Sequence, residues 1–167
     1  AWGGGLVFYS TLMEALGGQK VIGIDVYIPN DLKERLFSHG KISDRLFLIN
    51  QSSTDPQTID QINSIVGHSR DVLVILDSFH THDHVLKELQ MYSPLVGKGQ
   101  YLICGDTIVE DIPTQKHRVR PWGPGNNPKT ALRQFLKENN RFEIDRRFDK
   151  KLLFTTNPEG YLKCCKD

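Results

Sequence analysis

Two short apolar segments each end in an aspartate, and a histidine follows the first of them. Asp77 comes directly after the run Val72–Leu76 and is followed three residues later by His80. Asp106 follows a second run, Tyr101–Cys104, after a single glycine. Short runs rich in valine, isoleucine and leucine are typical of strands buried on both faces of a parallel sheet. Because ligands in open α/β sheets bind beyond the carboxyl ends of the strands, we expect Asp77, His80 and Asp106 at one site.

Two carboxylates and one imidazole at one sheet edge could support cation binding and proton transfer. Carboxylates bind hard cations such as Mg²⁺, and an imidazole with a pKa near the working pH can accept a proton. For an isolated Asp77, capping of the next helix would be the simpler interpretation, and His80 would then be a surface residue. The second strand that ends in an aspartate favours a site.

A zinc site is an alternative that the sequence leaves open. His80, His82 and His84 lie within five residues and could supply nitrogen ligands. No cysteine is close by, and His82 and His84 fall where a helix is expected to begin, so a solvated surface position is simpler for both. We therefore favour Mg²⁺ over zinc.

Glycines near the start of the chain indicate a nucleoside site. Gly3, Gly4 and Gly5 precede a helical pattern, and such glycines let backbone N–H groups approach a ligand. Asp25 comes 20 residues after Gly5, at the end of the predicted strand Lys20–Val26. An acid there commonly accepts hydrogen bonds from ribose hydroxyls. The dinucleotide pattern G-x-G-x-x-G is absent, which favours a nucleoside without phosphates, such as S-adenosylmethionine, over a pyrophosphate ligand.

Polar residues after the next predicted strand, Arg45–Asn50, could border the adenine. They are Gln51, Ser52, Ser53 and Asp55. For Ser52 and Asp55, simple loop contacts and capping of the following helix are equally good explanations.

Helical and strand patterns alternate along the chain, which predicts a three-layer α/β fold around a mostly parallel sheet. The topology expected is that of a Rossmann-like methyltransferase with an antiparallel last strand. Two closing strands are short enough in their spacing for an antiparallel hairpin. The expected helices are Leu6–Leu16, Leu32–Phe37, Pro56–Val66, one that follows Thr81 or Asp83, and one that begins at Pro128; the expected closing strands are Phe142–Phe148 and Lys151–Thr156.

A long irregular segment, residues 107–127, follows the strand that ends near Asp106. Connections of this length in a compact domain are usually functional or mobile. Because it begins at the ligand side of the sheet, we expect it to form a lid over a substrate. Trp122 could stack on a sugar face and Arg120 could bind an acidic group, although proline and glycine could also simply fix turns.

Length and composition indicate one domain over residues 1–167. The net charge of +1 gives no reason to expect nucleic acid as a partner, and no apolar run is long enough for a membrane span. The three cysteines contain no C-x-x-C pair, which suits a reducing compartment such as the cytoplasm. The sequence leaves open whether the protein is a homo-oligomer.

The chain begins immediately before the glycine cluster, at Ala1. A glycine cluster that opens a helix normally follows a strand. We therefore expect the domain to be N-terminally incomplete, with a first, central strand missing from its sheet.

Several motifs together resemble the cephalosporin hydroxylase / rhamnosyl O-methyltransferase family. The most specific is the segment RPWGPGNNPKT at residues 120–130, and the similarity extends from Ala1 to about Lys163. The other matching segments are WGGGLVFY at 2–9, VIGID at 21–25, VILDSFH at 74–80 and NPEGYL at 157–162.

This resemblance implies an S-adenosylmethionine-dependent O-methyltransferase with a Rossmann-like fold, acting with Mg²⁺ on the hydroxyl of a sugar or glycosylated natural product. Asp77 and Asp106 would hold the metal, and His80 would be the general base. The family usually has Glu-Asp where this chain has Gly105-Asp106. One expected carboxylate ligand is therefore absent.

Two other classes of function compete with this one. Gly105 would suit a non-catalytic homologue that binds a nucleoside or a partner protein. An NAD-dependent oxidoreductase is a further alternative, and the missing third glycine argues against it.

Overall fold

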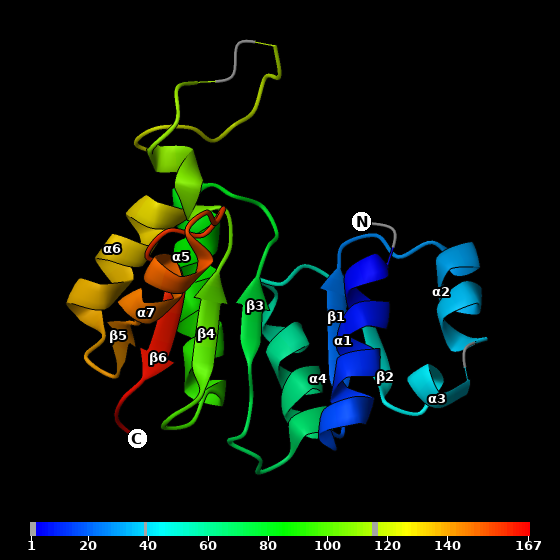
Figure 1. Ribbon diagram of the computed structural model, residues 1–167. Helices are drawn as coiled ribbons and strands as arrows, with labels where there is room; N and C mark the ends of the chain where they lie inside the picture. The colour runs from blue at the N-terminus through cyan, green and yellow to red at the C-terminus, as the bar shows by residue number, and fades with distance from the viewer. Residues whose placement is uncertain (1–2, 39, 115–116) are drawn as a thin grey trace. The chain divides into compact units, whose positions relative to one another are not determined.

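A computed structural model describes residues 3–38, 40–114 and 117–167, and its architecture is mixed α/β (Figure 1). The chain divides into two compact units, residues 1–68 and 69–167. Each unit has its own sheet, and the two are described separately below.

The first unit contains a two-stranded parallel sheet with β1 paired to β2. The register places Asp25, the last residue of β1, beside Asn50, the last residue of β2. Helix α1 packs on β1 through Leu6, whose methyl groups occupy the space that a side chain at Gly23 would need. The elements are α1 (Gly4–Leu16), β1 (Val21–Asp25), α2 (Asn30–Phe37), α3 (Gly40–Ser43), β2 (Leu46–Asn50) and α4 (Pro56–Val66).

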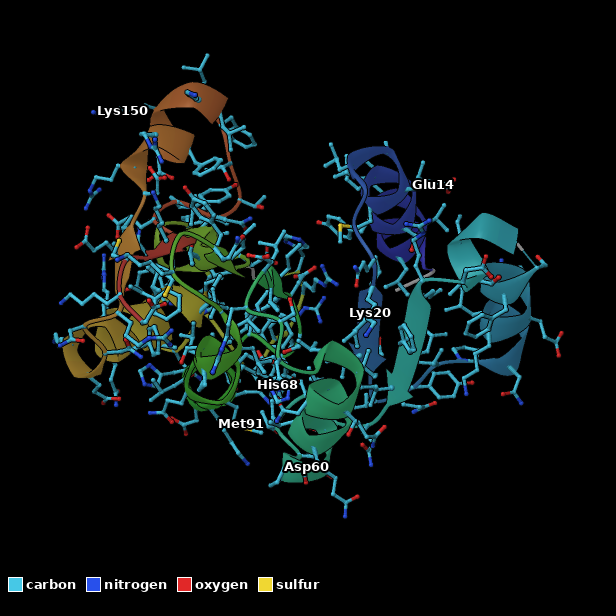
Figure 2. All side chains as sticks on the ribbon, turned by 90° about the horizontal axis from the view of Figure 1, so that it is seen from below. Glu14, Lys20, Asp60, His68, Met91 and Lys150 are labelled. Carbon is cyan, nitrogen blue, oxygen red and sulfur yellow. The ribbon has the colours of Figure 1, made fainter. Side chains whose placement is uncertain are left out.

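Helix α4 is fixed at both of its ends. Asp55 caps its start, where the carboxylate accepts a hydrogen bond from the backbone N–H of Gln57. Near its end, the Ile65 carbonyl accepts a hydrogen bond from Lys20, which is labelled in Figure 2. The Lys20 contact thereby joins the end of α4 to the residue that precedes β1.

The second unit contains a four-stranded mixed sheet in the order β3-β4-β6-β5. Strands β3 and β4 are parallel, and the last strand, β6, runs antiparallel to both of its neighbours. The elements are β3 (Val74–Leu76), α5 (His82–Tyr92), η1 (Ser93–Leu95), β4 (Tyr101–Cys104), η2 (Thr107–Glu110), α6 (Pro128–Glu138), β5 (Phe142–Ile144), α7 (Arg146–Leu152) and β6 (Tyr161–Cys164).

Side chains from α5, α6 and the sheet form the core of the second unit, where α5 and α6 lie side by side (Figure 1). Burial of such large apolar side chains contributes roughly 1.5–3 kcal/mol each. The fully buried apolar residues include Leu89, Leu102, Leu132, Phe135 and Leu162. This core holds the ends of β3 and β4, and the start of α5, in fixed positions.

The last two strands, β5 and β6, pair antiparallel as predicted, but the predicted bounds Phe142–Phe148 and Lys151–Thr156 and the short connection between them are wrong. Strand β5 ends at Ile144, a helix rather than a strand covers Arg146–Leu152, and the last strand begins only at Tyr161. Asp145 explains the change, because its carboxylate accepts hydrogen bonds from the backbone N–H and the guanidinium of Arg147 and so caps a helix. The alternation of apolar residues around Phe142 and Ile144 does not continue past this cap.

The other predicted elements are present, with ends that differ by a few residues. The short helix α3 (Gly40–Ser43) was not predicted, and the segment 107–127 begins with the 3₁₀ turn η2. Mixed α/β architecture is confirmed, whereas the three-layer arrangement around one sheet, the missing first strand and the single domain stay predictions.

Among the described residues, no helix combines the length and the apolar character that crossing a bilayer requires.

Candidate functional site

Asp77, His80 and Asp106 form a cluster at the carboxyl ends of β3 and β4. One potential ligand atom from each residue lies within 4.8 Å of those from the other two. The parallel register pairs Leu76 with Cys104, so the residues that follow the two strands emerge at the same edge of the sheet. The structure therefore brings together the three residues that the strand patterns indicated.

Gly105 allows the two strand ends to approach each other closely. Its N–H donates a hydrogen bond to the Leu76 carbonyl at 2.8 Å. A Cβ atom at position 105 would lie 2.6 Å from that oxygen and 3.5 Å from the Cβ of Asp77. The glycine that removes one expected carboxylate is thus required by the packing that places Asp106 near Asp77.

Asp106 adopts an unusual backbone conformation that a distant segment supports. Its φ of 51° and ψ of 31° lie in the left-handed region, which aspartate tolerates better than most residues. The backbone N–H of Asp106 donates to the Asn157 side-chain carbonyl at 2.8 Å, and the Thr107 hydroxyl donates to the Pro158 carbonyl at 2.7 Å. The segment NPEGYL therefore holds the turn that presents the Asp106 carboxylate.

His80 lies between the two carboxylates and is mostly buried. Its Nε2 atom is 3.2 Å from Asp106 Oδ2 and 3.7 Å from Asp77 Oδ1. The His80 side chain is only 12% exposed, whereas that of Asp77 is 71% exposed. The imidazole is thus shielded, while the neighbouring carboxylates are open to a ligand.

Electrostatics in the cluster favour an added positive charge. Burial raises the pKa of the Asp77 carboxyl above its ordinary value, the positive charge of a protonated His80 lowers it, and the negative charge of Asp106 raises it further. A cation or an imidazolium beside Asp77 and Asp106 would relieve this repulsion. The donor set of two carboxylates and one imidazole fits a small divalent cation such as Mg²⁺.

Trp122 reaches the cluster from the segment 107–127. Its ring makes edge contacts with the rings of His80 and Phe79, at centroid distances of 5.2 and 5.3 Å. The Arg120 guanidinium lies 4.9 Å from the centroid of the Trp122 ring. Trp122 therefore contacts His80, and Arg120 lies against the same tryptophan ring.

Asparagine side chains hold this segment in place. Asn126 accepts a hydrogen bond from the backbone N–H of His82 at 2.8 Å and donates to the Pro121 carbonyl at 3.0 Å. Asn127 caps α6 in a capping box with Thr130. The side chain of Asn126 thereby connects the first residue of α5 to the residue before Trp122.

The three histidines proposed as an alternative zinc site each contact different residues. The His82 ring lies 2.8 Å from the Thr130 hydroxyl and 3.0 Å from the Gln134 side-chain carbonyl, on α6. His84 Nε2 lies 3.5 Å from Glu88 Oε1. Within the described residues, the potential metal group that the structure forms contains His80 with two aspartates instead.

The first unit presents the predicted nucleoside residues. Gly3 has a φ of 73°, and within the part of the chain that the structure describes no side chain caps the start of α1, so the first N–H groups of the helix can receive a ligand. A Cβ atom on Gly4 would meet nothing within 4 Å, and one on Gly5 would meet only Tyr9 at 3.8 Å. Asp25 is exposed at the end of β1, and its Oδ1 accepts a hydrogen bond from the Tyr27 N–H at 3.0 Å. The open backbone and exposed carboxylate fit a nucleoside with free ribose hydroxyls.

The residues after β2 make local hydrogen bonds and cap the next helix. Ser52 Oγ lies 3.0 Å from Thr54 Oγ1, and Asp55 caps α4. Gln51 accepts a hydrogen bond from Gln61 at 2.6 Å. Ser53 lies in the same half-buried turn. The alternative explanation of loop contacts and capping therefore applies to Ser52 and Asp55, and their roles toward adenine stay predictions.

Reasoning from the sequence missed several residues that shape the cluster. Glu88 carries no pattern that distinguishes it from an ordinary helix residue. Phe79, Asn126 and Asn157 lie inside segments that carry the family resemblance. A search for backbone-holding roles in those segments could have identified both asparagines.

Comparison with known proteins adds independent information. A family model described as Rhamnosyl O-methyltransferase/CmcI matches residues 1–165. Proteins named rhamnosyl O-methyltransferase from Mycobacterium bovis, Mycobacterium tuberculosis and Mycobacterium leprae are each 30% identical to this chain over 165 residues, or 96% of it. The chain spans 62% of the length of the first two relatives and 66% of the third.

The substitution Gly105→Ala tests whether the close approach of the strands builds the cluster. The new methyl group cannot fit beside the Leu76 carbonyl without a backbone shift, so we expect a loss of about 1–3 kcal/mol in the free energy of unfolding. Metal affinity should fall together with stability. Gly40→Ala is the control, since a Cβ atom there meets nothing within 4 Å. Urea denaturation and Mn²⁺ titration measure both effects, and a stable Gly105→Ala variant with unchanged metal affinity would contradict the explanation.

Proposed function

The chain belongs to the Rhamnosyl O-methyltransferase/CmcI family, and we propose that it is an S-adenosylmethionine-dependent, Mg²⁺-assisted O-methyltransferase. Its proposed acceptor is a hydroxyl group of a sugar or glycosylated natural product. The single observation that carries the proposal is the group formed by Asp77, His80 and Asp106 at the ends of two adjacent parallel strands.

These three residues can activate a weak nucleophile, which the proposed reaction requires. A sugar hydroxyl is a poor nucleophile at neutral pH and must lose its proton as it attacks a methyl group. When bound, S-adenosylmethionine supplies an electrophilic methyl group and Mg²⁺ supplies positive charge that lowers the pKa of the hydroxyl. Asp77 and Asp106 would hold the cation, and two carboxylates are a sufficient protein contribution because Mg²⁺ usually keeps several waters.

His80 is the proposed general base. Its Nε2 atom faces the carboxylates of Asp77 and Asp106, which would stabilise the imidazolium formed when it accepts a proton. The edge contact with Trp122 restricts the orientation of the imidazole ring. A role for His80 as a third metal ligand is the competing assignment, and the two differ in what the loss of His80 does to metal affinity.

Trp122 and Arg120 are the proposed acceptor residues. The tryptophan ring offers apolar surface next to His80, which suits the C–H face of a sugar. Arg120 can donate hydrogen bonds to an acidic or hydroxyl group of the acceptor from its position over the same ring.

The proposed nucleoside residues belong to the first unit. Backbone N–H groups at Gly3, Gly4 and Gly5 would receive polar groups of S-adenosylmethionine, and Asp25 would accept hydrogen bonds from the ribose hydroxyls. Gln51, Ser52, Ser53 and Asp55 are the residues proposed to border the adenine.

Cellular context completes the proposal. Cys104, Cys164 and Cys165 are free thiols, which suits a reducing compartment such as the cytoplasm. Family membership does not favour the non-catalytic alternative that Gly105 raised, and the tight packing at Gly105 supplies a structural reason for that glycine.

Metal removal is the experiment that tests the proposed function. Methyl transfer from radiolabelled S-adenosylmethionine to a rhamnose-bearing glycoside should disappear with excess chelator and return with Mg²⁺. Asp77→Asn should require far more Mg²⁺, because one charged ligand is lost. The exposed Asp83→Asn, on α5, is the matched control and should behave as the parent protein. Undiminished transfer in excess chelator would exclude metal assistance, and no transfer under any condition would favour the non-catalytic homologue.

The role of His80 can be separated from that of the metal ligands. His80→Ala should lower kcat by roughly 10²–10⁴-fold, the usual contribution of a general base, and leave Mn²⁺ affinity nearly unchanged. His68→Ala, at an exposed position labelled in Figure 2, is the control. A parallel loss of Mn²⁺ affinity in His80→Ala would instead identify the imidazole as a metal ligand.

Asp25 should dominate nucleoside affinity. Removing a carboxylate that accepts hydrogen bonds from ribose costs on the order of 1.5–3 kcal/mol, which corresponds to a Kd for S-adenosylhomocysteine that is roughly 10- to 150-fold higher. Calorimetric titration of Asp25→Ala measures the change. Asp60→Ala, on the exposed side of α4, is the control (Figure 2). An unchanged Kd in Asp25→Ala would remove Asp25 from the site.

A further inference from the structure

Glu88 is a buried carboxylate on α5 that the proposed chemistry does not use. It is only 1% exposed. Its Oε1 atom accepts a hydrogen bond from the Ser78 hydroxyl at 2.7 Å and lies 3.5 Å from His84 Nε2. Its Oε2 atom is buried and has no hydrogen-bond partner among the residues that the structure describes. Glutamate is almost never fully buried without compensating contacts, so this position calls for a specific explanation.

The environment of Glu88 is the interior of the second unit. Tyr92 and Cys104 lie near enough that the charge of Glu88 adds to the rise of their pKa values, which burial causes in the first place. An apolar residue would pack here without the cost of placing a charge among apolar side chains. The carboxylate is therefore expected to contribute something other than stability.

Ser78 is the contact that gives Glu88 an influence on the cluster. It is the residue directly after Asp77 and lies two residues before His80. A backbone hydrogen bond from Thr81 N–H to the Phe79 carbonyl, at 2.9 Å, closes the tight turn that follows. The Ser78 hydroxyl fastens this turn, which carries both site residues, to the middle of α5.

His84 connects the Glu88 carboxylate to two aromatic residues of the site, Phe79 and Trp122. The His84 and Phe79 rings make an edge contact with centroids 5.7 Å apart, and Phe79 contacts Trp122 in the same way. The buried Glu88 carboxylate is thus linked to the Asp77–His80 turn through Ser78. Through His84 and Phe79 it is linked to Trp122.

We propose that Glu88 is a positioning residue that holds the Asp77–His80 turn in its cation-binding geometry through the hydroxyl of Ser78. The cation in this statement rests on the proposed function, whereas the fastening of the turn does not. Glu88 acts through an acceptor oxygen, so glutamine should replace it and alanine should not.

The test compares Ser78→Ala, Glu88→Ala, Glu88→Gln and the double alanine variant in the whole protein. Electron paramagnetic resonance measures Mn²⁺ affinity without acceptor or S-adenosylmethionine, and hydrogen exchange measures the opening of residues 77–81. Ser78→Ala and Glu88→Ala should each weaken Mn²⁺ binding about 10-fold and speed exchange in this turn, because each removes a charge-assisted hydrogen bond. The double variant should equal the single ones, since both remove the same interaction.

Glu88→Gln should retain Mn²⁺ affinity within about 3-fold, because its side-chain carbonyl can still accept from Ser78. Glu138→Ala, an exposed glutamate at the end of α6, is the control and should change neither readout. Ser78→Ala removes only one hydroxyl and remains informative if Glu88→Ala fails to fold.

The two proposals fail in different ways. Unchanged exchange at residues 77–81 in Ser78→Ala overturns the positioning role, as does a Glu88→Gln variant that is as impaired as Glu88→Ala. Absence of Mn²⁺ binding in the unmodified protein overturns the metal-assisted function, and the exchange measurement still decides the role of Glu88.

Discussion

The hydrogen bond between Gly105 N–H and the Leu76 carbonyl is the contact on which the candidate site depends. It joins the ends of two parallel strands at a separation that leaves no room for a side chain at position 105. Asp77 and Asp106 follow directly, and their carboxylates consequently lie close to each other and to His80. Like charges at this spacing repel each other, so the same contact that builds the group also makes it receptive to a cation.

Segments far apart in the sequence support this arrangement by binding backbone groups. Asn157 accepts the Asp106 N–H, and Gly160 lies so near the Cys104 carbonyl that a Cβ atom there would be 2.3 Å from the oxygen. Asn126 binds the first N–H of α5. The glycine- and asparagine-rich segments that carry the family resemblance therefore act in this structure as supports for the cluster and for Trp122.

The two units contribute different chemistry to the proposed reaction. The first carries an open helix start and an exposed aspartate that suit a nucleoside, and the second carries the carboxylates, the imidazole and the aromatic residues. The match to the Rhamnosyl O-methyltransferase/CmcI family covers residues 1–165 and so includes both. Metal binding by the second unit and nucleoside binding by the first can be measured with separate ligands.

The sequence by itself determined which strands end in charged residues. Val74–Leu76 and Tyr101–Cys104 are apolar runs with a sharp polar end, and a run of that kind is a local property that sequence displays directly. Because the two strands were expected to be parallel, Asp77 and Asp106 were expected at the same edge of the sheet. The start of α4 was predictable for the same local reason, since Asp55 and Pro56 are a helix-start signal.

Only the tertiary structure decided the closing elements and the buried charge. The Asp145 carboxylate, which caps the helix Arg146–Leu152, also accepts a hydrogen bond from the Tyr101 hydroxyl on β4, and only the fold brings Tyr101 there. Glu88 is a charged helix residue of the kind that is usually exposed, and only the packing of α5 within the second unit buries it beside Ser78. Such outcomes depend on contacts between residues distant in the chain or on opposite sides of a turn, and the local pattern of polar and apolar residues does not encode them.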